Sequence, residues 1–428
     1  MEGTMSDHQR IKEKLNRVLA EFVEQEPVTG LSVGIIYDNK MLYAKGFGVK
    51  NIETGEAVNE TTLYHMASVS KTLVAAGIMR LVELGKITLD DYVVDHLPYF
   101  TLSDGQYRKI TIRQLLTHTS GLPDEDEFEW DRPQYDELSL ERYVKSVKDR
   151  HLLWEPGTNF YYSNIGYEIL GDLIAKVTGV SFEQYMRENI LLPSGMRDGT
   201  FLKQEASDTS LATPHVLGIE NGYGGRVSDV FPYNRAHGPS STLYANAIDM
   251  CSYAIAQLKQ EVLSADCYDL MWRKYADTGY GPEMEGIGLS WFLGEYKGLR
   301  LVSHAGRDTG FRSHLVILPD KGIAVCVMTN SDYQGLKVVW QSVLDFLLGE
   351  EVPYIKKSLA HDLAGWTMSH GIEAAAERFR SIQPSQLDRY LVSEPELQFI
   401  ADTLFERGAR QESEQLRELS YRIFGEQH

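Results

Sequence analysis

LYHMASVSKTLVAAGIMRLVELGKITLDD (residues 63–91) contains the one S-x-x-K tetrapeptide of the chain, which runs from Ser68 to Lys71. We expect a helix over 68–84, and side chains three positions apart on a helix lie on one face. A serine hydroxyl becomes an effective nucleophile when a nearby base takes its proton, and lysine does so where its surroundings lower its pKa. The tetrapeptide alone also fits a surface helix with a capping serine and a solvated lysine, so its context decides.

Strand patterns lie near both ends of the chain, with a mainly helical middle between them. The early strands are LSVGIIY (31–37) and MLYAKGFG (41–48), joined by a tight turn. Amphipathic helices are expected at 8–25 and 334–348, and late strands at 288–294, 300–306, 312–319 and 322–330. This order predicts an α/β fold in which one sheet takes strands from both chain ends, and residues 105–260 form a helical lobe against it.

The sequence changes character after Pro353, where short amphipathic helices follow one another. They are expected at 371–382, 395–407 and 411–424. The predicted organisation is therefore a hydrolase domain at 1–352 and a helical C-terminal extension at 353–428. We expect residues 354–428 to be dispensable for the chemistry but not for solubility or oligomeric state.

The overall composition is that of an ordinary folded protein, with 43% apolar and 24% charged residues among 428. A net charge of −19 argues against a nucleic-acid partner, because phosphate backbones bind clustered Lys and Arg. Three cysteines without CxxC spacing, and no H-E-x-x-H or phosphate-cradling glycine loop, predict no metal and no other cofactor. No apolar signal segment and no membrane-spanning stretch are visible, so the expected location is cytoplasmic.

Three long stretches, in this order, resemble one known family. Residues 63–91, ITIRQLLTHTSGLP (110–123) and WEPGTNFYYSNIGYEILGDLIAKVTG (154–179) are similar to the β-lactamase-related serine hydrolases. That family includes class C β-lactamases, penicillin-binding proteins, D-amino-acid peptidases and esterases. The resemblance implies a β-lactamase/transpeptidase-like fold, in which an antiparallel sheet flanked by helices lies beside an all-helical lobe. It also implies that Ser68 is the nucleophile and Lys71 its partner.

Three Tyr-x-Asn triplets occur, beginning at Tyr37, Tyr162 and Tyr244. Tyr37 precedes a turn, as a hairpin residue does, whereas Tyr162 lies within PGTNFYYSN at the position of the family's Tyr-x-Asn element. We therefore prefer Tyr162, whose phenol can share a proton with a cationic lysine and act as base for attack and acid for the leaving group. Asn164 is then expected to bond the substrate amide or Lys71, with a helix cap as the alternative.

A third family element, often Lys-Thr-Gly, lies on a strand that borders the cleft. This chain has no such triplet, but His304-Ala305-Gly306 ends the strand RLVSHAG in the right order. The glycine allows close approach of backbone and substrate. By family position, the backbone amides of Arg307 and Ser68 are expected to form the oxyanion hole. A structural strand histidine is the alternative for His304.

Two features bear on substrate choice, the absence of the Lys-Thr-Gly triplet and an acidic run of residues. Lys and Thr of the usual triplet grip a carboxylate, whereas Ala305 has no hydroxyl and His304 is mostly neutral near pH 7. This favours amide, peptide or ester cleavage over efficient β-lactamase activity, unless Arg307 or Arg312 supplies a compensating cation. The run DEDEFEWDRPQYDE (124–137) is either a solvated loop or a cleft wall that favours a substrate with a free amine.

The predicted function is hydrolysis of small molecules or short peptides through an acyl-enzyme on Ser68. One alternative is a non-catalytic, penicillin-binding-like regulatory protein that docks a partner through its C-terminal helices. Another is an acyl-transferase that uses the same serine. A homo-oligomer is compatible with the sequence.

Overall fold

A nine-stranded sheet lies at the centre of the protein, in a computed structural model that describes residues 7–125, 127–219, 223–350 and 354–425. The strand order is β3-β2-β1-β13-β12-β11-β10-β9-β8, and neighbouring strands are antiparallel. β1 pairs with β13, from Leu31 opposite Thr329 to Ile36 opposite Ala324, so the predicted sheet with strands from both chain ends is confirmed. The strands are β1 Gly30–Tyr37, β2 Lys40–Asn51, β3 Glu56–Ala57, β8 Ala276–Asp277, β9 Gly286–Ile287, β10 Phe292–Tyr296, β11 Leu299–Asp308, β12 Phe311–Leu318 and β13 Ile323–Thr329.

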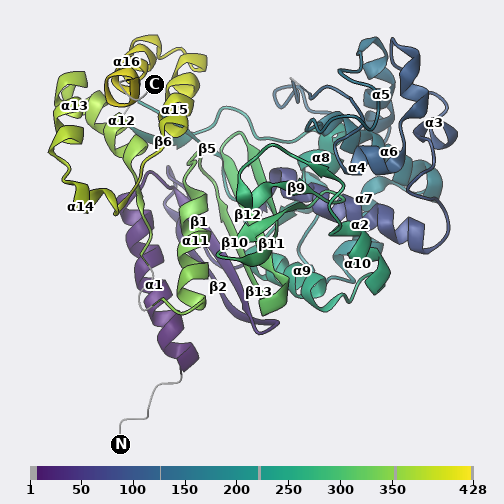
Figure 1. Ribbon diagram of the computed structural model, residues 1–428, viewed down its shortest axis with the longest axis horizontal. Coiled ribbons are helices and arrows are strands. Elements are labelled where there is room, and N and C mark those ends of the chain that lie inside the picture. Colours follow the sequence, from purple (N-terminus) through teal and green to yellow (C-terminus); the bar gives the residue numbers. More distant parts are fainter. Residues whose placement is uncertain (1–6, 126, 220–222, 351–353, 426–428) are drawn as a thin grey trace, which may run out of the picture.

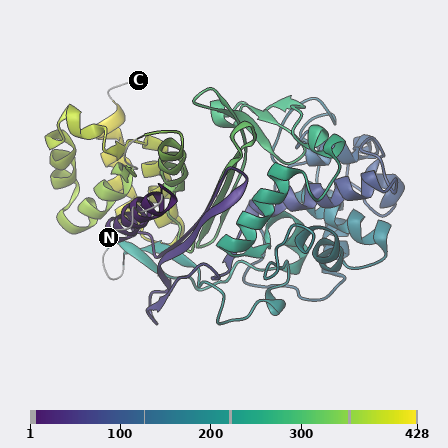
Figure 2. The same cartoon turned by 90° about the horizontal axis from the view of Figure 1, so that it is seen from below.

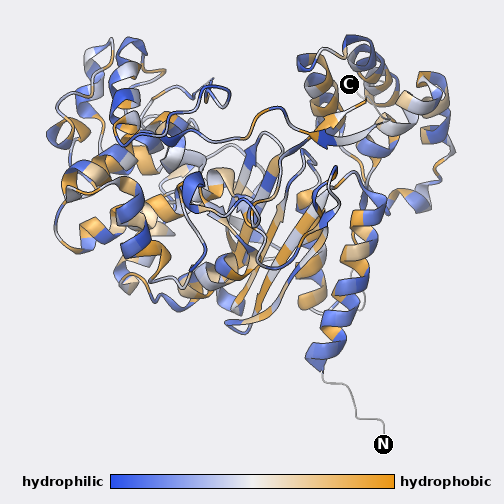
Figure 3. Cartoon of the chain, turned by 180° about the vertical axis from the view of Figure 1, so that it is seen from behind, coloured by the Kyte–Doolittle hydropathy of each residue, from blue (hydrophilic) through white to orange (hydrophobic). Residues whose placement is uncertain are grey.

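Helices cover both faces of the sheet (Figure 1). α1 (Asp7–Gln25) and α11 (Leu336–Leu347) pack on one face, and α9 (Ala247–Lys259) packs on the other. Successive residues of a strand point to opposite faces, so Val325 and Val327 of β13 join the α1/α11 side while Cys326 joins the α9 side. Burial of both faces explains why β1, β13 and the second half of β12 are mainly apolar, and strands of the sheet carry hydrophobic stretches in Figure 3.

The helical lobe lies on the α9 side of the sheet (Figure 2). α2 is buried along most of its length and ends before Gly85, whose φ of +64° suits a helix C-terminus. The lobe and its rim contain α2 Ser70–Glu83, α3 Val93–His96, α4 Ile112–Leu116, α5 Ser139–Ser146, α6 Asn164–Thr178, α7 Phe182–Met186, α8 Gly238–Ser241 and α10 Ala265–Met271.

The predicted strand at 288–294 is wrong. Two separate strands occupy this region, β9 and β10, and Ser290 between them has φ of +75°. Its N–H donates to the Leu116 carbonyl oxygen at 2.8 Å, so the chain bends toward α4. The buried side chains of Leu289 and Trp291 belong to this bend, which explains the apolar pattern without a strand.

Five helices follow the sheet in the described part of the C-terminal region. They are α12 Leu359–His370, α13 Ile372–Ser381, α14 Pro384–Leu387, α15 Glu394–Glu406 and α16 Arg410–Phe424. α13, α15 and α16 match the predicted helices, whereas α12 and α14 were not predicted. The helices pack on one another and on Leu217 of β5 (His215–Gly218) through Leu397, Ile400, Leu404 and Leu416. The predicted boundary at 352/353 lies outside the described residues, and the division into two domains stays a prediction.

In the ranges given above, no helix combines the length and apolarity needed to cross a bilayer. Nor do the described His, Cys, Asp and Glu side chains form a group of three or more suited to a metal ion. Cys251, Cys267 and Cys326 are buried as free thiols.

Candidate active site

Ser68 lies in the middle of a single 3₁₀ turn, Ala67–Val69, that leads directly into α2. The α-helix therefore begins at Ser70, two residues later than predicted. Ala67 has φ of +47°, in the left-handed region that a residue with a Cβ adopts only under strain. This bend presents the Ser68 side chain to a cleft.

Hydrogen bonds from neighbouring segments hold the strained turn. Ser313 of β12 donates from Oγ to the Met66 carbonyl oxygen at 2.6 Å, and the Met66 N–H donates to the Leu243 carbonyl oxygen at 2.8 Å. On the other side of the nucleophile, Ser70 Oγ accepts from the Leu243 N–H at 3.0 Å. The strain persists because these contacts fix the backbone on both sides of Ser68.

Lys71 is fully buried and points at the nucleophile. Its Nζ donates to Ser68 Oγ at 2.9 Å and to the Ser240 carbonyl oxygen at 2.8 Å. The same nitrogen lies 5.1 Å from the ring centroid of Tyr162 and 5.5 Å from that of Tyr167. The predicted meeting of Ser68 and Lys71 is thus present in the geometry.

Burial lowers the pKa of Lys71 to about 8, because a buried ammonium loses its hydration. The carboxylates of Glu168, Asp124 and Asp308 act in the opposite direction and favour the charged form. About a tenth of the lysine is therefore neutral at pH 7 and able to accept a proton.

Two buried residues, Glu168 and His237, form a hydrogen-bonded dyad next to Ser240, the residue whose carbonyl accepts from Lys71. Glu168 accepts from His237 Nδ1 at 3.1 Å and from the Ser240 N–H at 3.2 Å, and the Ser240 carbonyl oxygen accepts from Lys71. Desolvation raises the pKa of Glu168, while its bond to His237 acts in the opposite direction. The dyad fixes the peptide that orients the lysine.

Tyr162 stacks on His118, with ring centroids 4.3 Å apart, and lines the cleft together with Ser68. Burial raises the pKa of Tyr162 well above its ordinary value, so the phenol keeps its proton at neutral pH. Tyr244 lies in β7 (Tyr244–Ala245), away from the cleft lining, and Tyr37 is a partly exposed hairpin residue. Of the three Tyr-x-Asn triplets, only that of Tyr162 lies beside the nucleophile.

Asn164 is the first residue of α6, where Ser163 is the N-cap. Asp124 Oδ1 accepts from the Asn164 backbone N–H at 2.8 Å and from its Nδ2 at 2.9 Å. Of the two expected partners, Lys71 is not bonded by Asn164: the lysine donates to Ser68 and Ser240, and Asn164 Oδ1, the atom that could accept from it, has no partner. Asn164 lines the cleft, and its Oδ1 is buried without a hydrogen-bond partner. This oxygen therefore remains able to accept from a substrate amide.

His304 is buried in β11 and lines the cleft. Its Nδ1 lies 2.7 Å from the Ala305 carbonyl oxygen, and because a carbonyl only accepts, Nδ1 carries the proton. Nε2 has no partner and is left as an acceptor. Burial, together with the Lys71 charge, lowers the pKa of His304 to about 3, so this residue is neutral and gives no cation for a carboxylate.

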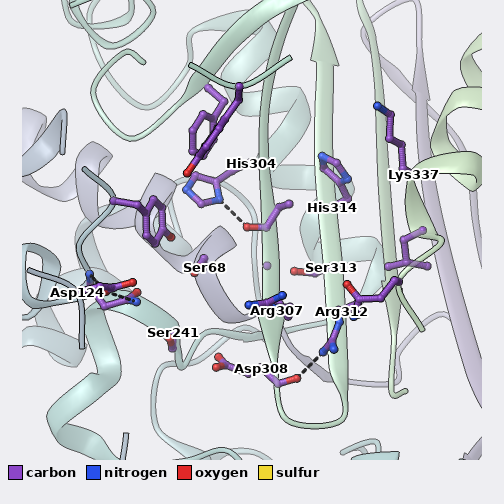
Figure 4. A pocket seen from close by; sticks show the side chains of 18 of the residues that line it. Ser68, Asp124, Ser241, His304, Arg307, Asp308, Arg312, Ser313, His314 and Lys337 are labelled. Atoms are coloured by element: carbon purple, nitrogen blue, oxygen red, sulfur yellow. Dashed lines mark hydrogen bonds between the residues drawn. The ribbon is translucent and has the colours of Figure 1, made fainter. Parts of the chain in front are cut away.

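The cleft around Ser68 has a volume of about 580 Å³ (Figure 4). Tyr162, Asn164 and Asp124 line one side, and the end of β11 lines the other with Gly306 and Arg307. β10 pairs with β11 only as far as Ser303, so one edge of the backbone after that residue is open toward the nucleophile turn. The remaining lining residues are Glu125, Phe128, Ser241, Tyr280, Phe292, His304, Ala305, Asp308, Arg312, Ser313, His314, Gln334, Leu336 and Lys337.

Similarity to known proteins agrees with this geometry. The sequence profile of the β-lactamase family matches residues 15–347, well over half of the chain. The chain belongs to the β-lactamase family. Penicillin-binding protein 4 of Amycolatopsis lactamdurans, a curated relative, is 30% identical over 337 residues, which cover 76% of this chain and 85% of that protein. Protein flp of Staphylococcus aureus strain MW2 is 26% identical over 326 residues; the match covers 75% of this chain but only 64% of the length of flp.

Solved structures of β-lactamase-like proteins share the fold. The octameric penicillin-binding protein homologue from Pyrococcus abyssi has a TM-score of 0.72 at 28% identity, over 82% of this chain and 81% of that chain. The D-amino acid amidase of Ochrobactrum anthropi SV3 has a TM-score of 0.66 at 21% identity, over 78% and 98%, a likeness of fold alone. The predicted β-lactamase/transpeptidase-like fold is thereby confirmed.

Several residues around Ser68 were not predicted. His118 lies within the LTHTSGLP stretch and Asp124 within the acidic run, so both had a sequence signal without a defined role. The Ser240 carbonyl gives no signal, because any residue supplies a carbonyl oxygen. Glu168 is a fully buried charged residue of α6, and a charge within an otherwise largely apolar helix was the one available signal.

Proposed function

We propose that this β-lactamase family protein is a serine hydrolase that forms an acyl-enzyme on Ser68 and cleaves small amides, peptides or esters. The observation that carries the proposal is the 2.9 Å contact between Lys71 Nζ and Ser68 Oγ inside an open cleft. A solvated helix-surface lysine does not fit this position, because Lys71 is fully buried.

The proposed reaction begins with neutral Lys71, which takes the Ser68 proton as Oγ attacks the substrate carbonyl carbon. The backbone amides of Ser68 and Arg307 hold the resulting oxyanion, an assignment supported by the family resemblance and by the open edge of β11. Tyr162, which keeps its proton, donates it to the leaving group as the bond to it breaks, and protonated Lys71 returns the Ser68 proton to the phenolate. Water then attacks the ester on Ser68 and releases the acid.

The proposed acyl donor carries a free amine. Two carboxylates of the acidic run, Asp124 and Glu125, line the cleft. Asp124 lies beside Asn164, and Glu125 pairs with Arg150 at 3.0 Å. An ammonium near Asp124 gains attraction, whereas the neutral His304 offers a carboxylate nothing. Benzylpenicillin is accordingly expected to acylate Ser68 but to be hydrolysed slowly.

The packing of the C-terminal helices weighs against a non-catalytic docking protein. Leu397, Ile400 and Leu404 of α15 are buried against neighbouring helices and Leu217, so this apolar face already has a partner within the chain. An acyl-transferase remains the second candidate, since an acyl-enzyme on Ser68 serves both reactions. We also propose a homo-oligomer, by analogy with the Pyrococcus abyssi homologue, whose structure is octameric.

The direct test is labelling with a fluorophosphonate probe, followed by mass mapping of the modified peptide. We expect the label on Ser68 and a burst of p-nitrophenol from p-nitrophenyl acetate. Ser68→Ala should abolish both, with a loss on the order of 10⁶ in turnover. Retention of more than about a tenth of the activity by Ser68→Ala would refute the assignment. Added amine acceptors separate transfer from hydrolysis, because only a transferase yields a new amide in place of the free acid.

A further inference from the structure

One rim of the cleft is cationic. Arg307, Arg312 and Lys337 line it from β11, β12 and α11, as Figure 4 shows. Arg312 is buried, and its Nη1 donates to the carbonyl oxygens of Asp308 and Phe311 at 2.7 Å each. Lys337 forms an ion pair with Glu283, a residue that does not line the cleft. The side chain of Arg307 is exposed and, within the described residues, makes no hydrogen bond or ion pair.

The guanidinium of Arg307 has an aromatic support from a remote part of the chain. Phe399 of α15 lies under it, with the guanidinium carbon 5.5 Å from the ring centroid, and Arg312 lies 5.9 Å from the same ring. A guanidinium stacked on a ring keeps its N–H donors free at its edge. Phe399 thus orients Arg307 without consuming its hydrogen-bonding capacity.

A second contact fixes α15 against the hairpin of β11 and β12, which carries Arg307 and Arg312. Arg407, directly after α15, forms an ion pair with Asp332 and donates to the Leu217 carbonyl oxygen at 2.6 Å. Asp332 also pairs with Arg312 at 3.2 Å and accepts from the Gly310 N–H at 2.9 Å. α15 therefore contacts two cleft-lining residues, Arg307 and Arg312, while the dispensability of residues 354–428 for the chemistry stays a prediction.

We propose that the C-terminal helices complete the substrate site, with Phe399 holding Arg307 as a binding subsite for a carboxylate on the leaving-group side. This inference rests on the proposed hydrolase function. The positions of the usual Lys-Thr-Gly triplet offer no carboxylate grip, because Ala305 lacks a hydroxyl and His304 Nε2 is an acceptor. A guanidinium whose N–H donors are unoccupied binds a carboxylate in bidentate fashion. With Asp124 on the opposite side, the cleft suits a short peptide with a free amine and a free carboxylate.

The test uses two ligands that differ only in the carboxylate, D-alanyl-glycine and D-alanyl-glycinamide. Calorimetric titration of the Ser68→Ala protein gives both dissociation constants without turnover. We expect the free acid to bind about tenfold more tightly than the amide. Phe399→Ala and Arg307→Gln, each added to Ser68→Ala, should reduce this ratio to about twofold or less, and Phe399→Tyr should preserve it.

Phe405→Ala is the matched control, because Phe405 lies on the same helix, is 48% exposed and stacks with Arg410 rather than with a cleft residue. It should keep the tenfold ratio. Equal binding of acid and amide by the parent, an undiminished ratio in Phe399→Ala, or an equal loss of affinity for both ligands would each overturn the proposal. The ratio does not depend on catalysis, so failure here is distinct from failure of the labelling of Ser68.

Discussion

Gly306 of β11 packs so closely against Met66 that a Cβ at position 306 would lie 2.3 Å from the Met66 carbonyl oxygen. The same Cβ would lie 2.4 Å from Ser313 Oγ, which donates to that oxygen. The strand and the nucleophile turn are therefore in contact through a position that only glycine fits. Any side chain there moves β11 away from Ser68.

Gly306→Ala should lower kcat/KM for p-nitrophenyl acetate by about 10²-fold while leaving a folded protein, because a displacement near 1 Å disrupts the alignment of reacting groups. Steady-state kinetics and circular dichroism measure the two effects. Gly105→Ala is the control, since nothing lies within 4 Å of a Cβ at that position. Equal activity of the two variants would show that the strand adjusts without cost.

The pH dependence of acylation should report Lys71. Because burial lowers its pKa to about 8, the neutral base accumulates as the pH rises, and kcat/KM should increase with pH and level off above about 8. Glu168→Gln removes a charge that favours the protonated lysine, so the midpoint should move to lower pH. Asp172→Asn, on the same helix but bonded to Tyr99, should leave it unchanged. A shift to higher pH in Glu168→Gln contradicts this assignment.

Tyr162→Phe removes the proposed proton donor but keeps the ring that stacks on His118. Turnover of an amide substrate should fall by about 10²–10⁴, with little change in substrate binding. An ester with a good leaving group, such as p-nitrophenyl acetate, should suffer less, because p-nitrophenolate leaves without a proton. Tyr244→Phe should be close to neutral; the reverse order of the two variants would assign the role to Tyr244.

Stability should fall with rising pH because of two buried glutamates, Glu396 of α15 and Glu26 near the end of α1. Burial raises the pKa of Glu396 and of Glu26 to about 7, above the unfolded value near 4.5. The folded state therefore holds protons that the unfolded chain has released. The contribution of these two protonated glutamates to the free energy of unfolding is fully present below about pH 4.5. It is lost as the pH rises through 7.

Glu396→Gln cannot ionise and should raise the free energy of unfolding at pH 8 by about 1–3 kcal/mol, with little effect at pH 4.5. Urea denaturation at the two pH values measures the difference. Glu406→Gln, exposed at the end of the same helix, should change neither value. A Glu396→Gln variant that is less stable at pH 8 would mean that the charged form is the one that the fold accommodates.

The sequence allowed the sheet, most of its strands and the nucleophile helix to be predicted, because their signals are local. Apolar runs mark doubly covered strands, and the spacing of Ser68 and Lys71 follows helix geometry. The bend at Ser290 escaped prediction, since buried Leu289 and Trp291 give the same pattern as a strand.

Contacts between distant segments had no local signal. The pairing of Asn164 with Asp124 depends on where a loop lies relative to α6, and the aromatic support of Arg307 comes from Phe399, on a helix far along the chain. Phe399 sits in an amphipathic helix like any other aromatic residue. Only the three-dimensional arrangement distinguishes it from the exposed Phe405.

The central pairing of β1 with β13 also bears on how the protein is made. During translation, Ser68 emerges from the ribosome long before Thr329, the residue that pairs with Leu31. The lobe helices can form early from local contacts, but β10, β11 and β12, which pair with one another, are joined to β1 and β2 only when β13 arrives. The central ladder of the sheet therefore closes late in synthesis, and a chain that ends before β13 lacks the strand that joins β1 to β12.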